Sequence, residues 1–141
     1  MASLKVEIVT PEAALWTGEA TALMARSSEG QFTILPQHTS TVGDIVPGLV
    51  RVATASGELG FCVHGGYFQV GPDDDAGVTR ATVLAGIAER VGDIDVARAQ
   101  TAKEAAEAQL AAGGDLDDAA RALYEASLAR AQLRLRLAAA R

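Results

Sequence analysis

The alanine-rich last third of the chain constrains its fold most strongly. Seventeen of the 49 residues from Asp93 to Arg141 are alanine, and the only glycines there are the adjacent Gly113 and Gly114. Alanine has the highest intrinsic helix propensity and glycine nearly the lowest. This stretch therefore predicts an antiparallel hairpin of two helices with a turn at 113–115. Because a buried alanine stabilises far less than a buried leucine, we expect the two helices to hold each other weakly.

Charged residues mark the predicted helix ends. Asp93 is the predicted N-cap of the first helix. Acidic residues also follow the glycine pair, where they suit the positive end of the second helix dipole: Asp115, Asp117 and Asp118. From residue 130 onward the chain carries four arginines and no acid: Arg130, Arg134, Arg136 and Arg141. The second helix is therefore expected to end with a strongly cationic turn.

The 92 residues before the hairpin have a different pattern. Apolar and polar residues alternate from Leu4 to Thr10, which is the period of a half-buried strand. Further strand-like stretches, separated by glycine and proline turns, cover residues 20–26, 32–35, 49–54, 58–64, 67–70 and 78–84. Short strands at this spacing predict an all-β sandwich or barrel. The predicted fold is therefore α+β with two domains, a β domain over residues 1–88 and a helical hairpin over 89–141.

Composition excludes several classes of function. The net charge is −6, of which residues 1–92 carry −5, and so acidic a body argues against nonspecific nucleic-acid binding. The single cysteine, Cys62, excludes an internal disulfide and fits a reducing compartment. No apolar run approaches the roughly 18–20 residues of a membrane-spanning helix. Charges at Lys5 and Glu7 do not fit a secretory signal. We expect a cytoplasmic protein that reaches a membrane only through a partner.

Motifs of enzymes and metal sites are missing from the sequence. It has no Gly-Lys-Ser/Thr triplet of a P-loop, and no Ser-His-Asp or Cys-His arrangement in a supporting context. Two histidines and one cysteine do not have zinc-site spacing, and His64, beside Gly65-Gly66, is predicted to be structural. Asp73 to Asp75 lacks the alternating ligands of a calcium loop and is predicted to be a solvated hairpin turn. We therefore predict no catalytic residue, no metal and no required cofactor.

Several motifs together resemble one family, the ε subunit of bacterial F-type ATP synthases. They occur in the family's order and spacing over essentially the whole chain: Ser28-Glu29-Gly30, Ile34 to His38, Pro47 to Arg51, Val63 to Tyr67, Val78 to Leu84, and Ile94 to Ala99. One departure is Gln37, where the family usually has glycine between the proline and the histidine.

The resemblance implies a fold and a place in a complex. It implies a β-sandwich of about ten strands at the foot of the rotating central stalk, which binds the γ subunit and touches the ring of c subunits. It also implies that the hairpin either folds against the sandwich or extends along γ into the α/β catalytic hexamer. The extended form would suppress ATP hydrolysis. The subunit itself would be non-catalytic and peripheral, on the cytoplasmic face of the bacterial plasma membrane.

The resemblance also nominates interface residues. Glu29, Gln31 and His38 lie in predicted turns that would face the c ring and γ, where polar turns fit a partly wet interface. The alternative is that these are ordinary solvated turns. His38 has no nucleophile beside it in the sequence, which argues against a role as a catalytic base.

A nucleotide site is the third implication of the resemblance. In family members that bind ATP, a motif of the Ile94 to Ala99 form and arginines of the second helix contact the nucleotide. The candidate contacts to ATP as a regulatory ligand are Glu89, Ile94, Asp95, Arg98, Ala99, Arg130 and Arg134. Alternatively, Asp95 and Arg98, three residues apart on one helical face, pair with each other or only fix the hairpin on the sandwich. In the extended state, inhibitory contacts to acidic loops of the β subunits would come from Arg130, Arg134 and Arg136.

A rival function remains open from the sequence. A β-sandwich binding module with a helical dimerisation tail has the same order of domains. It predicts a stable homodimer, whereas an ε subunit is expected to be a monomer that joins γ.

Overall fold

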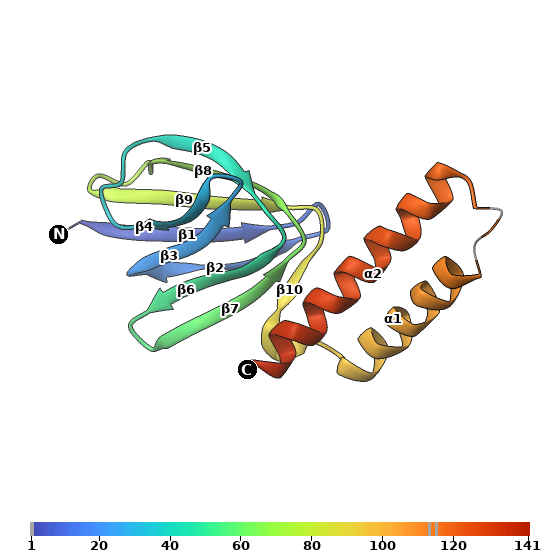
Figure 1. Cartoon of the computed structure of the whole chain (residues 1–141). Helices are drawn as coiled ribbons and strands as arrows, with labels where there is room; N and C mark the ends of the chain where they lie inside the picture. Colours follow the sequence, from blue (N-terminus) through green and yellow to red (C-terminus); the bar gives the residue numbers. More distant parts are fainter. Residues whose placement is uncertain (1, 113, 115) are drawn as a thin grey trace. The chain divides into compact units, whose positions relative to one another are not determined.

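A computed structural model describes residues 2–112, 114 and 116–141. In this part of the chain, ten strands precede a short 3-10 helix and two α-helices (Figure 1). The chain divides into two compact units, the first ending at Arg90 and the second starting at Val91. The division lies two residues after the domain boundary that the sequence predicts.

The first unit is a sandwich of two five-stranded sheets (Figure 1). The first sheet has the order β2 (Ala14–Ala20), β1 (Ser3–Val9), β9 (Val78–Ala85), β8 (Gly66–Pro72), β5 (Thr41–Ile45). The second has the order β10 (Ala88–Arg90), β7 (Gly57–Val63), β6 (Gly48–Thr54), β3 (Ala22–Ser27), β4 (Gly30–Ile34). Neighbouring strands are antiparallel except β1 and β9, which run parallel from Ser3↔Val78 to Val9↔Leu84. The predicted sandwich of about ten strands is confirmed.

Alternation along the strands builds the core between the sheets. On β1, Leu4, Val6 and Ile8 are completely buried, while the intervening polar residues are partly exposed. Each sheet contributes every second residue in this way, because successive strand side chains point to opposite faces. Two aromatic pairs extend the core: Trp16–Phe61, with ring centroids 6.5 Å apart, and Phe32–Phe68, stacked at 4.4 Å.

Three strands have no strand-like stretch of their own in the sequence. β2 has a weak burial alternation, and β10 is only three residues long. β5 is interrupted by Gly43, which leaves room for an aromatic ring. A Cβ at Gly43 would lie 2.6 Å from the ring carbon Cε1 of Phe68, so this strand requires a residue of low β-propensity.

The second unit is the predicted helical hairpin. It comprises the 3-10 helix η1 (Val91–Asp93), α1 (Val96–Ala111) and α2 (Asp118–Ala139). The N-cap of α1 is Asp95, whose carboxylate accepts the backbone N–H of Arg98 at 3.0 Å. The prediction of Asp93 as N-cap was wrong, because the chain makes a 3-10 turn there before α1 begins. Asp117 caps α2 and accepts the N–H of Ala120 at 2.7 Å.

The connection between the helices is only partly described. Of the turn predicted at 113–115, Gly113 and Asp115 lie outside the described residues. Gly114 is in a turn, and its N–H donates to the carbonyl of Ala112 at 3.0 Å.

Small residues dominate the buried positions of the hairpin. In α1 the buried residues are Ala99 and Ala106, and in α2 they are Ala131, Leu133 and Ala138. The alanines of each helix are seven residues apart, which is about two turns and keeps them on one face. We call Ala99, Ala106, Ala131 and Ala138 the alanine seam.

The C-terminal residue ties the two ends of this unit together. Arg141 donates from Nη1 to the carbonyl of Val91 at 3.0 Å and to those of Gly92 and Ile94 at 3.4 Å. The end of α2 is thereby fixed to the segment that leads into α1. We call these three hydrogen bonds of Arg141 the arginine clamp. The sequence analysis predicted only a cationic end of the second helix and not these contacts.

Candidate functional site

The predicted interface turn around Glu29 is held in place by a neighbouring strand. Ser27 Oγ accepts the N–H of Glu29 at 3.1 Å and donates to the carbonyl of Gly30 at 3.2 Å. From β5, Asp44 accepts the backbone N–H and the hydroxyl of Ser28, each at 2.9 Å. These hydrogen bonds lower the pKa of the Asp44 carboxyl below its usual 3.8. Sequence reasoning missed Asp44, whose only signal is a charge inside a short strand.

The three predicted interface residues do not form one cluster. Glu29 and Gln31 are exposed at the start of β4, beside Asp44. His38 is half-buried beyond the other end of β4, and its neighbour Gln37 donates its N–H to Thr79 at the start of β9. Asp44 is connected through β8 to the opposite end of β9. Glu29 and Gln31 are therefore separated from His38 by roughly the length of β9, whose residues each span about 3.3 Å.

The departure from the family pattern at Gln37 has a conformational consequence. Gln37 has φ of 69°, and it is the one non-glycine residue with positive φ in the described part of the chain. Its N–H donates to Oγ1 of the buried Thr79 at 2.7 Å. A glycine adopts this left-handed conformation without strain. The loop therefore keeps the conformation expected for glycine while carrying a glutamine.

The Ile94 to Ala99 motif forms the beginning of α1. Ile94 and Ala99 are buried, and Asp95 and Arg98 are exposed. The hydrogen bond between Asp95 and Arg98 joins the Asp95 carboxylate to the backbone N–H of Arg98, not to its guanidinium. Among the described residues, no ion pair joins these two side chains. The two residues are thus joined by the helix-capping hydrogen bond in this structure, and the choice between nucleotide binding and fixing of the hairpin stays a prediction.

The α2 arginines lie toward the same end of the hairpin as this motif. Arg130 and Arg134, four residues apart, share a helical face and are half-buried, whereas Arg136 is exposed. The arginine clamp fixes the end of α2 beside Ile94, so the C-terminal turns of α2 lie along the first turns of α1. Glu89 belongs to the other unit, where it lies opposite Cys62 in the pairing of β10 with β7.

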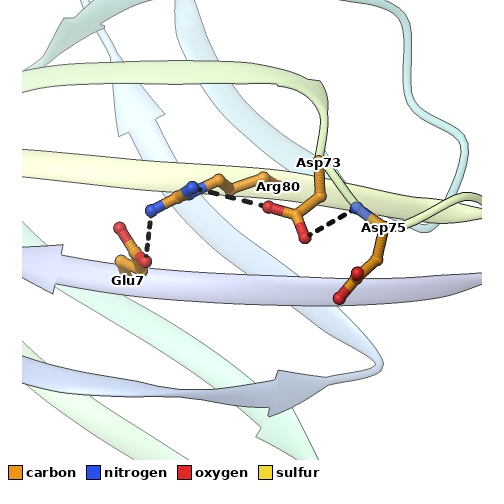
Figure 2. A network of polar contacts seen from close by, with 4 residues as sticks. All are labelled: Glu7, Asp73, Asp75 and Arg80. Carbon is orange, nitrogen blue, oxygen red and sulfur yellow. Dashed lines mark hydrogen bonds and ion pairs between the residues drawn. The ribbon is translucent and has the colours of Figure 1, made fainter.

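The outer face of the first sheet carries an ion network that the sequence did not reveal (Figure 2). Arg80 donates from Nη2 to Glu7 Oε1 at 2.6 Å and from Nη1 to Asp73 Oδ1 at 3.4 Å. The N–H of Asp75 donates to the other oxygen of Asp73 at 3.4 Å. The Asp73 side chain is only 7% exposed, so the prediction of a fully solvated turn was wrong for this residue.

A shallow groove and exposed apolar side chains adjoin this network. The groove has a volume of about 450 Å³, and its lining includes Glu7, Val9, Gln69, Arg80, Thr82 and Leu84. On the same face Val42 is 74% exposed and Tyr67 is 67% exposed. Tyr67 lies opposite Leu84 in the pairing of β8 with β9. We call Val42, Tyr67 and Leu84 the apolar face.

Neither described helix is both long enough and apolar enough to cross a membrane.

Both parts of the chain match family models. Residues 3–91 match the ATP synthase Delta/Epsilon chain beta-sandwich domain, and residues 93–139 match the Delta/Epsilon chain long alpha-helix domain. The ATP synthase epsilon chain of Thermobifida fusca is 42% identical over 140 residues, covering 97% of this chain and 93% of that protein. The epsilon chain of Dehalococcoides mccartyi is 38% identical over 138 residues, covering 98% of this chain and 94% of that protein.

Solved structures share the fold at lower sequence identity. A chain of the Euglena gracilis mitochondrial ATP synthase structure, OSCP/F1/c-ring, superposes with a TM-score of 0.74 at 23% identity, covering 100% of this chain and 83% of that chain. A chain of the Tetrahymena thermophila mitochondrial ATP synthase central stalk/c-ring structure gives 0.58 at 16% identity, covering 96% of each chain.

The resemblance seen in the sequence motifs is thus confirmed over both domains. With a family model matched by each unit and bacterial relatives aligned over almost their full length, this chain belongs to the ATP synthase epsilon chain family, whose members are non-catalytic subunits of that complex.

Proposed function

We propose that this chain is a rotor subunit of an F-type ATP synthase, in which the sandwich joins the γ subunit to the c ring. Support comes from the two solved structures with this fold, which contain a c-ring and, in the Tetrahymena case, a central stalk. The chain would act at the cytoplasmic face of the bacterial plasma membrane. It would be held there by its partners, because its described helices do not cross a membrane.

The apolar face is the candidate surface for γ. Large exposed apolar side chains that adjoin each other are uncommon on a protein without a partner. Tyr67 and Leu84 lie opposite each other on neighbouring strands, and Leu84 also lines the groove of about 450 Å³. Tyr67→Ala is expected to weaken co-purification with γ, whereas the same truncation of exposed Leu123 on α2 leaves it unchanged. Equal retention of γ by both variants contradicts this assignment.

The hairpin is proposed to switch between a folded form and an extended form that inhibits ATP hydrolysis. The observation that carries this proposal is the alanine seam. Burying a leucine side chain contributes roughly 1.5–3 kcal/mol, and an alanine methyl about 0.8 kcal/mol. A hairpin whose buried residues are mostly alanine loses little free energy when it opens or changes its neighbours.

Removing the hairpin from the assembled enzyme tests the inhibitory role. A chain that ends at residue 92 keeps all ten strands of the described sandwich. We expect the assembled synthase with this shorter chain to hydrolyse ATP faster than the intact enzyme. Retention of the shortened subunit in the purified complex is the necessary control. An unchanged hydrolysis rate in a complex that retains the subunit refutes inhibition by the hairpin.

We further propose that ATP is a regulatory ligand of the hairpin. Arg130 and Arg134 share a helical face at i and i+4, so both guanidinium groups can reach one bound anion. A triphosphate satisfies both guanidinium groups, since arginine presents a planar fork of donors to phosphate. Arg98, at the same end of the hairpin, is the third candidate cation.

Calorimetry on the isolated chain tests nucleotide binding. Titration with millimolar ATP is expected to release heat, and Arg98→Ala is expected to weaken binding at least tenfold. Lys103→Ala, which removes another cation of α1 outside the motif, is the matched control and keeps the wild-type affinity. Absence of heat with the wild-type chain, or equal affinities of the two variants, refutes this site while leaving the rotor assignment intact.

A further inference from the structure

Strand pairing brings a thiol, an imidazole and a carboxylate together in the sandwich. Cys62 lies in β7 and His64 directly follows the last residue of that strand, Val63. Residues two apart in an extended chain project to the same side, which places both side chains together. Glu89 on β10 is directly opposite Cys62 in the antiparallel register. The pairing continues one step further, because the N–H of His64 donates to the carbonyl of Ile87 at 3.0 Å. The backbone therefore holds all three residues on adjacent segments of the chain.

These side chains project away from the hydrophobic core. Phe61 and Val63, the neighbours of Cys62 on β7, belong to the core cluster, and Cys62 does not. Cys62 is nevertheless completely buried, and His64 and Glu89 are half-buried. The three ligand atoms, one from each residue, all lie within 4.8 Å of one another. Three metal-binding groups thus converge at a place where bulk water has limited access.

The closest separation in this cluster matches the geometry of a tetrahedral metal site. Cys62 Sγ lies 3.6 Å from His64 Nε2. A zinc ion binds sulfur at about 2.3 Å and imidazole nitrogen at about 2.0–2.1 Å, and at a tetrahedral angle these two atoms are about 3.6 Å apart. The sulfur and nitrogen therefore already stand at the separation that a shared ion requires. A carboxylate oxygen of Glu89 lies within 4.8 Å of both atoms, and a rotation of this side chain would bring it toward a shared ion.

We propose that Cys62, His64 and Glu89 form a binding site for a divalent transition-metal ion of the zinc type. A thiolate and an imidazole select a borderline or soft ion over calcium or magnesium, which prefer oxygen ligands. Three protein ligands leave the fourth tetrahedral position to a water molecule or another ligand. The ion would bridge β7 and β10 and so fasten the short last strand to its sheet.

The sequence pattern conceals such a site. Structural zinc sites are recognised by paired cysteines or histidines with two to five residues between them. Here Cys62 and His64 are separated by one residue, and Glu89 comes from a strand 25 positions after His64. The third ligand becomes visible only through the register of β10 with β7. A competing reading of the 3.6 Å contact is a weak hydrogen bond between thiol and imidazole, which needs no metal.

Cobalt(II) binding to the full-length chain distinguishes the two readings. Cobalt bound to a thiolate gives a sulfur-to-cobalt charge-transfer band in the near ultraviolet and visible bands typical of tetrahedral coordination. We expect these bands to saturate at one ion per chain and to disappear when zinc is added. The titration is done without nucleotide, because Glu89 is also among the predicted ATP contacts.

Single-site variants identify the ligands. Cys62→Ser is expected to abolish the charge-transfer band, and His64→Ala and Glu89→Gln are each expected to weaken cobalt binding at least tenfold. Even residues that only orient a metal ligand change affinity by about 10–100-fold. His38→Ala removes the other histidine of the chain and is expected to keep wild-type binding.

Three results overturn the proposal. The first is a wild-type chain that shows no thiolate band at millimolar cobalt. The second is unchanged affinity in Glu89→Gln, which nearly preserves the shape of the side chain and so is expected to fold. The third is loss of binding in His38→Ala, which would place the ion elsewhere. Circular dichroism confirms that each variant is folded before the titration.

Discussion

Replacing Gln37 by glycine is expected to stabilise the sandwich. A non-glycine residue in the left-handed region costs roughly 1–2 kcal/mol, and Gln37 has φ of 69°. Glycine removes this strain but loses about 0.5–1 kcal/mol through the greater freedom of the unfolded chain. Taken near the middle of both ranges, the net gain is about 0.5–1 kcal/mol. The hydrogen bond to Thr79 is kept in the variant, since it comes from the backbone N–H.

The single tryptophan gives the assay for this prediction. Trp16 packs against Phe61 in the sandwich, so its fluorescence follows the unfolding of that unit during urea titration. A gain of about 0.5–1 kcal/mol corresponds to a Tm increase of roughly 2–8 °C for a unit of this size. Gln37→Ala keeps the strain and is the matched control, with an expected change within about 0.5 kcal/mol. If Gln37→Gly is no more stable than Gln37→Ala, the positive φ of residue 37 does not destabilise the sandwich, and the prediction is refuted.

Three further substitutions test the contacts described above. Gly66→Ala is expected to destabilise the sandwich by about 1–3 kcal/mol in urea titration, because the new Cβ would lie 2.2 Å from the carbonyl oxygen of Leu84. Asp44→Asn is expected to lower stability at neutral pH. The folded pKa of Asp44 is lowered by Ser28, so its contribution exists above pH 3.8 and is lost as pH falls through the folded value. Stability curves of wild type and variant should therefore converge in acid, and parallel curves contradict this. Arg141→Ala is expected to cost the hairpin about 1 kcal/mol and to speed hydrogen exchange in the last turn of α2, whereas unchanged exchange refutes the clamp.

Sequence patterns predict those elements whose local signal agrees with the fold. Apolar and polar residues alternate strictly along β1, and the hairpin is rich in alanine with a glycine pair between its helices. Both elements were therefore predicted from the residues alone. β5 was not found, because Gly43 is needed to make space for Phe68 and weakens the strand signal. Asp93 was predicted as the N-cap, but it belongs to the 3-10 turn Val91–Asp93, and the cap is Asp95, a second aspartate two residues later.

Functional contacts were harder to predict because they join distant parts of the chain. The ion network of Arg80 depends on the parallel pairing of β1 with β9, which places Glu7 beside a residue 73 positions later. The cluster of Cys62, His64 and Glu89 likewise depends on the register of a three-residue strand. Family resemblance nominated Glu29 and His38 together, and only the sheet topology shows that they lie at different ends of the sandwich.

The parallel pair of β1 and β9 also sets an order of events during synthesis. β1 leaves the ribosome well before its partner β9, which ends at Ala85, so one edge of β1 has no native neighbour until almost the whole sandwich has been made. Until then β1 pairs only with β2, and a lone two-stranded hairpin is marginally stable. The arrival of β9 completes the first sheet by linking β1 to β8. The first sheet can thus be completed only late in the synthesis of the sandwich, shortly before the residues of the hairpin are made.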